Sequence, residues 1–277
     1  MSDSAWRLLA ASAKGPKKKV NQDYHDMHVS SDGAEVFMAV ADGHGSAAYP
    51  RSDIGSRLAV EAFLEVVTEF WRSCNRDDQL RHVHFRAKED LPRDVVHNWR
   101  SRVRDHLERE PFTGAVPVGP EIYGTTLLGA VVSEWLVLGW QLGDGELCVL
   151  HSDGEPVLPL YDSSEPAGDE TYSMCSPGAR HLMRLYWAPV QAEQPLRLLT
   201  LSTDGLSNSF VSMADYLDFV RGIDRRLSDN GADQVAADLP EWLKRASSYS
   251  GDDTTFVGAW CNPRLQEGSD VRNSQVR

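Results

Sequence analysis

The chain has 277 residues, 41% hydrophobic and 25% charged, which is the composition of an ordinary globular protein with a substantial core. Its net charge of −13 repels phosphate backbones and anionic membranes, so the composition argues against a nucleic-acid or membrane partner. Four widely spaced cysteines, without a CxxC pair, argue against a disulfide framework or a thiolate zinc site.

The N-terminal segment lacks the order of a signal peptide, because its basic residues follow the short apolar run instead of preceding it. No window has the length and apolarity of a membrane span, and WLVLGW is much too short. We therefore expect a cytoplasmic protein.

The first third of the chain predicts a strand over 5–13, a lysine-rich loop (GPKKK), and a hairpin formed by 24–29 and 35–41. A long helix follows, because apolar residues recur every three or four positions. They are Ala59, Ala62, Phe63, Val66, Val67, Phe70 and Trp71. Such a stripe is typical of a helix that packs on a sheet.

The polar segment 75–92 is interpreted as a loop or insertion, and a second helix is predicted from 94 to about 110. His82 and His84 are assigned to the surface, because they lie in a charged loop without an acidic partner pattern, and His97 and His106 are expected on the solvent-facing side of the second helix.

The second half begins with three predicted strands joined by tight turns, TTLLGAVVS, EWLVLGWQLGD and GELCVLHSDGEPVLPL. Segment 161–195 has little periodicity and is interpreted as an irregular crossing or a short helix. The remaining elements are a strand over 196–202, helices over 214–227 and 232–247, and a strand over 252–260. Strands in hairpins and helices in consecutive groups predict an α+β fold, with antiparallel sheets covered by helices. We expect one domain over 1–261 and a disordered tail over 262–277.

One device recurs along the chain: an apolar strand stops at an aspartate beside a glycine or a second aspartate. The positions are Asp42-Gly43, Asp144-Gly145, Asp204-Gly205 and Asp252-Asp253, with Asp23 as a fifth candidate. Each alone is explained as an ordinary turn. If the strand ends meet, two carboxylates about 4 Å apart repel by about 4 kcal/mol at an effective dielectric constant of about 20. Such a cluster requires cations or raised pKa values, and oxygen ligands favour Mg²⁺ or Mn²⁺.

The residues of these motifs resemble the motifs of the type-2C family of metal-dependent serine/threonine protein phosphatases, in a compact, bacterial-like form. The motifs stand in family order: NQD at 21–23, VADGHG at 40–45, GTTLLGAVV at 124–132, LGDGELCV at 142–149, LSTDGLSN at 201–208 and DDTTFV at 252–257. The resemblance implies a four-layer αββα sandwich, with two central antiparallel β-sheets flanked by helices and a metal centre at one end.

Carried over residue by residue, the resemblance implies that Asp42 bridges two Mn²⁺ or Mg²⁺ ions and that the Gly43 carbonyl is also a ligand. Asp23, Asp204 and Asp252 supply further carboxylates, and Asp144 helps to hold a possible third ion. The implied reaction is hydrolysis of phosphoserine and phosphothreonine in proteins by a metal-activated water, without a phosphoenzyme. His44 is the candidate proton donor to the leaving oxygen. A partner Ser/Thr kinase is also implied, and we expect a monomer.

Two features depart from the family pattern. Counting back to the position where a phosphate-binding arginine is common gives Lys18, with Lys14, Lys17 and Lys19 close by; the alternative is a solvated basic loop. The flap segment, 161–194, is short and atypical. These departures leave two alternatives open: a metal-binding pseudophosphatase that docks phosphoproteins without turnover, and hydrolysis of small phosphoesters.

Overall fold

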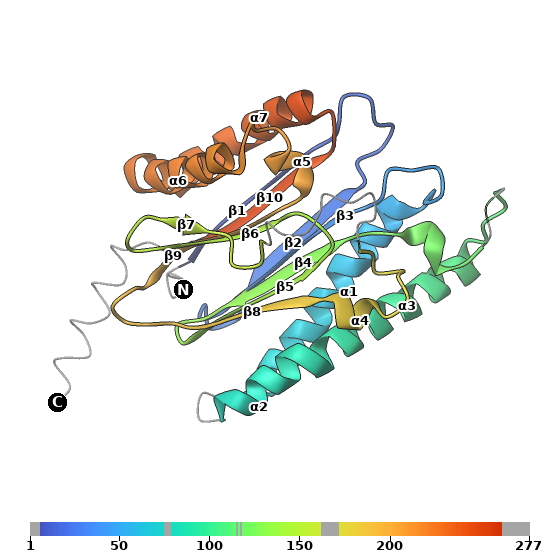
Figure 1. Cartoon of the computed structure of the whole chain (residues 1–277), viewed down its shortest axis with the longest axis horizontal. Helices are drawn as coiled ribbons and strands as arrows, with labels where there is room; N and C mark the ends of the chain where they lie inside the picture. The colour runs from blue at the N-terminus through green and yellow to red at the C-terminus, as the bar shows by residue number, and fades with distance from the viewer. Residues whose placement is uncertain (1–5, 75–78, 115, 117, 162–171, 262–277) are drawn as a thin grey trace.

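Two five-stranded antiparallel sheets lie face to face between two layers of helices in the computed structural model, which describes residues 6–74, 79–114, 116, 118–161 and 172–261 (Figure 1). The first sheet has the order β1 (Trp6–Ala13), β10 (Thr254–Cys261), β9 (Leu196–Ser202), β6 (Glu146–His151) and β7 (Pro156–Val157). The second has the order β2 (Asp23–Val29), β3 (Val36–Asp42), β4 (Leu127–Val132), β5 (Leu136–Leu142) and β8 (Arg184–Pro189). The predicted fold class is confirmed.

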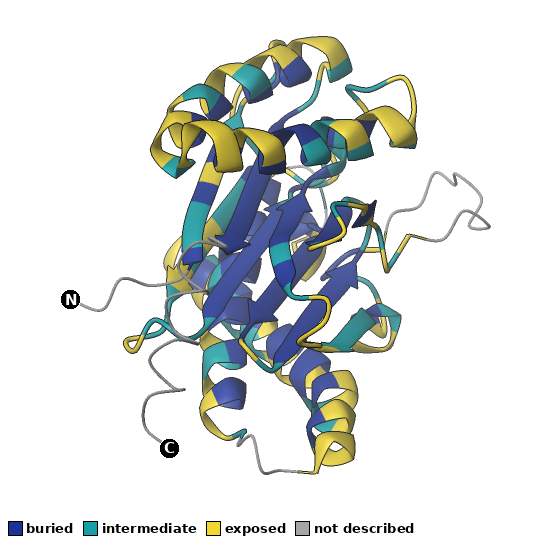
Figure 2. Cartoon of the chain, turned by 90° about the vertical axis from the view of Figure 1, so that its left-hand side faces the viewer, coloured by how far each residue is buried: buried dark blue, intermediate teal, exposed yellow. Residues whose placement is uncertain are grey.

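The helices form the two outer layers. The second sheet is covered by α1 (Ser52–Arg72) and α3 (Leu91–Arg109), with α2 (Leu80–Phe85) preceding α3 and α4 (Ala179–Leu182) beside it. The first sheet is covered by α6 (Met213–Asn230) and α7 (Ala232–Ser250), and the short α5 (Asp204–Ser207) follows β9 directly. Figure 2 shows the consequence: buried strands in the middle and helices whose outward faces are exposed.

Three apolar layers hold these four layers of backbone together. Phe63, Val67 and Trp99 pack with Trp140 between the helices and the second sheet. A middle layer joins the two sheets, and a third layer packs the first sheet against α6 and α7. The predicted helical stripe of α1 is therefore confirmed, since most of its members face the sheet.

The interpretation of segment 75–92 as a loop is wrong from residue 80 onward. α2 continues through a π-helical turn (Arg86–Asp90) into α3. The reason is a thin apolar stripe, with Val83, Ala87 and Leu91 spaced four residues apart and each at most 2% exposed. One small apolar residue per turn suffices here because the Trp140 indole also donates a hydrogen bond to the Ala87 carbonyl, at 2.8 Å.

Two further expectations are corrected by the sheet topology. The strands on either side of the tight turn at 143–145 do not pair with each other as neighbours in one antiparallel sheet, because β5 and β6 belong to different sheets and the chain crosses between them. Segment 161–195 contains an edge strand, β8, which pairs with β5. Residues 162–171 of that segment and the predicted tail, 262–277, lie outside the described residues. None of the described helices has the length and apolarity needed to cross a membrane.

Close backbone packing of α1 gives a test of the fold. A Cβ at Gly55 would lie 1.9 Å from the Tyr123 carbonyl oxygen, whereas a Cβ at Gly222, in α6, would meet only the guanidinium end of the Arg226 side chain, at 2.9 Å. We expect Gly55→Ala to lower the free energy of unfolding by about 1–3 kcal/mol, because backbone must move. Gly222→Ala should instead raise it by up to about 1 kcal/mol, through helix propensity. Urea unfolding of both variants measures this, and equal effects would contradict the packing.

Candidate active site

Four of the predicted aspartates lie at one end of the sandwich, where strands of both sheets begin or end. Asp23 opens β2 and is directly opposite Asp42, which closes β3. Asp204 opens α5 immediately after β9, and Asp252 stands two residues before β10. The two sheets are joined here, because Thr203, beside β9, donates a hydrogen bond to Asp23 Oδ2 at 2.8 Å. The structure therefore brings together carboxylates that are far apart in sequence.

The backbone of Asp42 is fixed by two threonines. The Thr125 hydroxyl and the Thr126 amide both donate to the Asp42 carbonyl at 2.8 Å, and the Asp42 amide donates to Thr126 Oγ1 at 3.0 Å. Gly43 follows, and a Cβ there would lie 2.6 Å from the Ser52 carbonyl oxygen. Only glycine therefore fits at this first position of the loop between β3 and α1. These contacts explain the GTT motif, whose role sequence reasoning did not assign.

Asp23 is the most buried of the four carboxylates, at 7% exposure. Its Oδ2 accepts from Thr203, but its Oδ1 is buried without a hydrogen-bond partner among the residues described. Burial raises the pKa of this carboxyl to about 7. A buried carboxylate oxygen with no partner is costly, and it is the kind of atom that a cation would satisfy.

Asp42 and Asp204 share a hydrogen bond and repel each other when both are charged. Burial and the charges of Asp23 and Asp204 raise the pKa of Asp42 well above its ordinary value. Burial and the charge of Asp144 raise the pKa of Asp204 to about 6. Without a cation, the cluster therefore retains protons that isolated carboxyls would release.

Lys18 supplies a positive charge to this cluster. Its ammonium lies 2.5 Å from Asp252 Oδ1 and 3.9 Å from Asp253 Oδ2, and it hydrogen-bonds to Gln22. Burial alone lowers the pKa of the ammonium, but the bond to Asp252 and the nearby negative charges raise it overall. The lysine predicted to bind phosphate thus lies at the carboxylates in this structure.

Lys14 lies on the same loop, but its side chain contacts the loop backbone and not the carboxylates. Its ammonium donates to the carbonyls of Gly15 and Lys18, so it braces the loop that carries Lys18. The structure does not bring Lys14 to the carboxylates. Its predicted phosphate contact would require these two hydrogen bonds to break.

His44 stands next to the cluster in the loop between β3 and α1. Its backbone is held by Gly124 and Gln22, and its ring packs edge-on against Tyr49, with centroids 4.7 Å apart. Burial lowers the pKa of the imidazole, and the Asp144 charge opposes this. Asp144 is exposed in the turn between β5 and β6 and interacts electrostatically with both His44 and Asp204.

Within the described residues, no three His, Cys, Asp or Glu side chains are already arranged as a metal-ligand group. The carboxylates instead pair with what is present: Asp252 with Lys18, and Asp42 with Asp204. The donor set is nonetheless all oxygen, it is negatively charged, and it contains the unpartnered Asp23 Oδ1. These properties fit Mn²⁺ or Mg²⁺.

Comparison with known proteins shows where this arrangement belongs. The family model described as protein phosphatase 2C matches residues 15–244. The chain belongs to this family. Comparison with the curated proteins gives no match.

Solved structures share the fold of this phosphatase family member at low sequence identity. The catalytic domain of the serine/threonine phosphatase PstP, solved with two manganese ions, is 19% identical, with a TM-score of 0.57 over 92% of this chain and 97% of that one. Stp1 from Staphylococcus aureus is 15% identical, with a TM-score of 0.57 over 92% and 94%. A sex-determining protein of C. elegans is 17% identical, with a TM-score of 0.63 over 94% and 66%.

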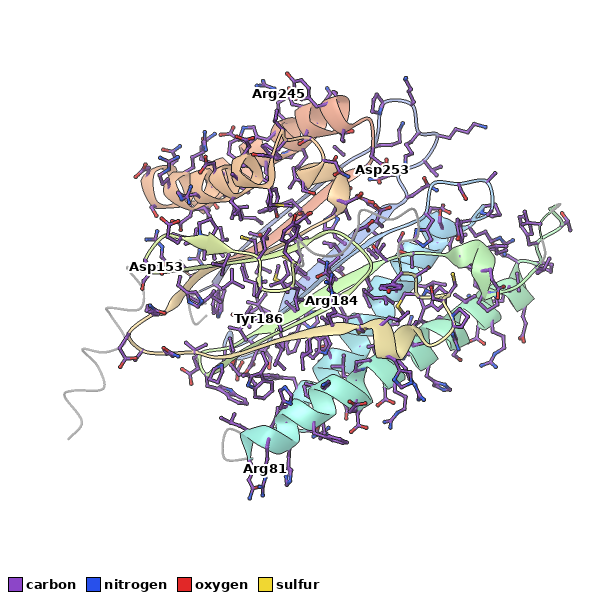
Figure 3. The ribbon with its side chains drawn as sticks, in the orientation of Figure 1. Arg81, Asp153, Arg184, Tyr186, Arg245 and Asp253 are labelled. Atoms are coloured by element: carbon purple, nitrogen blue, oxygen red, sulfur yellow. The ribbon has the colours of Figure 1, made fainter. Side chains whose placement is uncertain are left out.

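Two buried acids beside the cluster were not given firm roles by the sequence. Glu146, at the start of β6, is 8% exposed and accepts from Ser202, and burial raises its pKa to about 8. Asp253 is 1% exposed and accepts from the amides of Gly15 and Gln22, each at 2.7 Å. Figure 3 shows Asp253 beside α5. The signal in the sequence was a place in the Asp252-Asp253 motif for Asp253, and a charge at the edge of an apolar strand for Glu146.

Part of the expected flap, from residue 172 onward, packs against Thr125 on one side of the site. The Met174 amide donates to the Thr125 carbonyl, and Ser173 exchanges hydrogen bonds with the same residue. Because Thr125 also holds Asp42, this segment buttresses the turn that presents Asp42. The part of the predicted flap at 162–171 lies outside the described residues.

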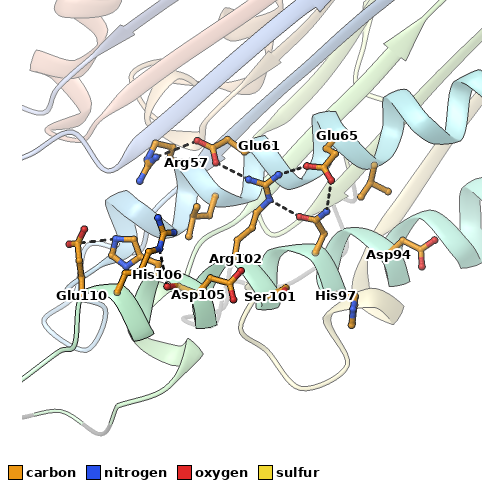
Figure 4. Close-up of a pocket in the computed structure, with 14 residues that line it drawn as sticks. Arg57, Glu61, Glu65, Asp94, His97, Ser101, Arg102, Asp105, His106 and Glu110 are labelled. Carbon is orange, nitrogen blue, oxygen red and sulfur yellow. Dashed lines mark hydrogen bonds and ion pairs between the residues drawn. The ribbon is translucent and has the colours of Figure 1, made fainter.

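A groove of about 850 Å³ lies away from the cluster, between the outer faces of α1 and α3 (Figure 4). Its charges are largely paired with one another, as Arg102 is with Glu61 and Glu65. His106, which we expected at the surface, is buried at its edge and hydrogen-bonds to Tyr123. The clustered carboxylates with raised pKa values lie at the strand ends and not in this groove, so we interpret the groove as a result of the packing of α1 against α3.

The proton affinity of the cluster predicts how stability depends on pH. In the folded protein the pKa is about 7 for Asp23 and about 6 for Asp204, whereas the ordinary pKa of an aspartate side chain is 3.8. Both carboxyls therefore keep their protons to a higher pH than they would in the unfolded chain. Between these values the unfolded chain binds fewer protons, so the stability of the metal-free protein falls as pH rises from about 4 to about 7.

Asp23→Asn keeps the acceptor for Thr203 but removes the buried charge. We expect it to raise the unfolding free energy of the metal-free protein at pH 8 by up to about 4 kcal/mol, with little gain at pH 4. Denaturant unfolding in EDTA at both values measures this. Asp105→Asn, at an exposed carboxylate of α3, is the control. A gain of equal size at both pH values would refute the buried-charge explanation.

Proposed function

We propose that this chain hydrolyses phosphoserine and phosphothreonine in proteins, as a Mn²⁺- or Mg²⁺-dependent phosphatase without a phosphoenzyme. The observation that carries the proposal is the convergence of Asp23, Asp42, Asp204 and Asp252 at one end of the sandwich, with one buried oxygen unpartnered among the described residues. Membership of the protein phosphatase 2C family supports it. We also propose that residues 1–261 act as one catalytic domain.

The residues that would hold two ions are these four aspartates and the Gly43 carbonyl, with Asp144 directed to a possible third. Two manganese ions in the PstP structure support the choice of cofactor. When bound, such ions supply a hydroxide nucleophile near neutral pH and neutralise phosphate charge. The protein's own contribution is to hold the carboxylates on rigid strand ends, where Thr125, Thr126 and Thr203 fix their positions.

Lys18 would have two roles in this proposal. Its pairing with Asp252 compensates the carboxylates when no metal is bound. If Asp252 turns to a metal, the ammonium is released close to Gly45, beside the turn that carries His44. It could then bind the substrate phosphate as a point charge, without the bidentate geometry of an arginine.

His44 is proposed to donate the proton to the departing seryl or threonyl oxygen. Its half-buried ring lies next to the carboxylates, and Asp144 favours its charged form. A proton donor must be protonated to act. Since burial lowers the pKa of this imidazole, the rate with phosphothreonine should fall as pH rises through a value below the ordinary 6.5.

A test of the overall function uses a phosphothreonine peptide, with added Mn²⁺ or with EDTA. We expect phosphate release only with the metal, and near-background rates for Asp42→Ala and Asp204→Ala, because each removes a proposed metal ligand. Asp105→Asn is the control. Peptide binding by calorimetry without phosphate release would favour the pseudophosphatase, whose motivation is that Lys18 stands where an arginine is common. Release only from small phosphoesters would favour a different substrate class.

A test of His44 compares substrates whose leaving groups differ in their need for a proton. We expect His44→Ala to slow hydrolysis of a phosphothreonine peptide by about 10²-fold or more. Hydrolysis of p-nitrophenyl phosphate should change much less, because its phenolate leaves without protonation. Steady-state kinetics of both substrates measures the difference. Equal losses would assign His44 a structural role only.

A further inference from the structure

The loop between β1 and β2 concentrates positive charge in an acidic protein. The chain has six lysines, and four of them lie between residues 14 and 19, although the net charge is −13. Figure 1 shows this loop projecting beyond the strands at the end of the sandwich. Through Lys18 the loop contacts Asp252, so this positive charge lies at the edge of the candidate active site.

The loop is held at both ends. Buried Asp253 accepts from the amide of Gly15 with one oxygen and from the amide of Gln22 with the other, each at 2.7 Å. Between them, the Lys18 amide donates to the Gly15 carbonyl at 3.1 Å, which closes a turn. Lys14 braces the same turn from outside. The backbone of the loop between Gly15 and Gln22 is therefore anchored relative to the carboxylates.

The three consecutive lysines differ in their surroundings. Lys18 is half-buried and turned to Asp252, whereas Lys17 and Lys19, on either side of it, are exposed. Neither of these two forms a hydrogen bond or ion pair with another residue in the described part of the chain. Two exposed lysines thus flank, in the chain, the residue that reaches the candidate site.

We propose that Lys17 and Lys19 bind acidic side chains that flank the phosphorylated residue of a protein substrate. This inference rests on the proposed phosphatase function and names the class of substrate. An acidic segment is repelled by the net charge of the protein, and two cations on the loop counter that repulsion locally, since the attraction of an exposed charge extends over about 8 Å at physiological salt.

The surface is too small to be a strong nucleic-acid site. Two free ammonium groups would neutralise few phosphates, and the rest of the chain is acidic. A short acidic peptide needs only one or two such contacts. Charge complementarity therefore favours a peptide over a nucleic acid as the occupant.

The test compares two phosphoserine peptides of equal length, one flanked by Asp and Glu and the other by Asn and Gln. In the presence of Mn²⁺ we expect a higher kcat/KM for the acidic peptide. The double variant Lys17→Gln/Lys19→Gln should reduce this preference by about fivefold, the scale expected for two exposed ion pairs. Higher salt should reduce it in the wild type as well.

A matched control removes two exposed positive charges at a distance from the loop. Arg81→Gln/Lys88→Gln changes α2 and the adjoining π-helical turn, and Figure 3 shows Arg81 far from Asp253. This variant has the same net charge as the test variant. We expect it to keep the preference, and an equal loss in both variants would show that only overall charge matters and overturn the proposal.

Equilibrium binding separates this inference from the proposed function. Fluorescence anisotropy of both labelled peptides, without metal, should show tighter binding of the acidic peptide to the wild type than to Lys17→Gln/Lys19→Gln. If no phosphate is released but this difference remains, the enzyme proposal fails and the docking surface stands. If both peptides bind and react equally, the surface proposal fails. It also fails if a single-stranded oligonucleotide binds through these lysines more tightly than the acidic peptide.

Discussion

Repulsion between carboxylates is the constraint around which this end of the molecule is built. Asp23 and Asp42 face each other across adjacent strands, and Asp204 and Asp252 approach from the other sheet. Two such charges about 4 Å apart repel by about 4 kcal/mol at an effective dielectric constant of about 20. A flexible chain would separate them. Here three apolar layers fix the strands, and the remaining repulsion is relieved by retained protons and by Lys18.

The supporting contacts are placed where the two sheets could otherwise move apart. Thr203 crosses from the end of β9 to Asp23, and its hydroxyl also accepts from the Thr255 amide at 2.9 Å. Thr125 and Thr126 hold the turn at Asp42 from within the second sheet. Hydroxyl groups suit these positions, because each can donate to a carboxylate or carbonyl and accept from a nearby amide. The spacing of the carboxylates thus depends on uncharged neighbours.

Much of the fold could be predicted from the sequence, because strand and helix patterns are local. The stripe of α1 and the aspartates at strand ends are examples. What was missed depends on the tertiary structure. Only Val83 in α2 and Ala87 in the π-helical turn after it mark the buried face of this segment, and Trp140, which hydrogen-bonds to Ala87, is distant in the sequence. β8 is a partly exposed edge strand whose hydrogen bonds come from β5.

The candidate site was predictable in its residues but not in its pairings. Repetition of the Asp-Gly motif identified the carboxylates, whereas the position of Lys18 at Asp252 depends on a loop that is anchored by a hydrogen bond between residues 238 apart in the sequence. Lys14 and Lys18 look equivalent in the sequence, and only the loop conformation separates them. Similarly, His106 in α3 is buried where its ring hydrogen-bonds to the hydroxyl of Tyr123, which follows α3 in the chain.

The place of β10 in its sheet has a consequence for the order in which the protein assembles. β10 follows every other described strand in the sequence, yet it lies between β1 and β9 and is the partner of β1 in the sheet. The same segment brings Asp252 and Asp253, which complete the carboxylates and clamp the lysine loop. During synthesis, β1 therefore cannot form its sheet pairing until β10 has been made, some 240 residues later. A nascent or truncated chain without β10 has neither the first sheet in its final form nor the full set of carboxylates, so the candidate site is complete only when the whole sandwich has closed.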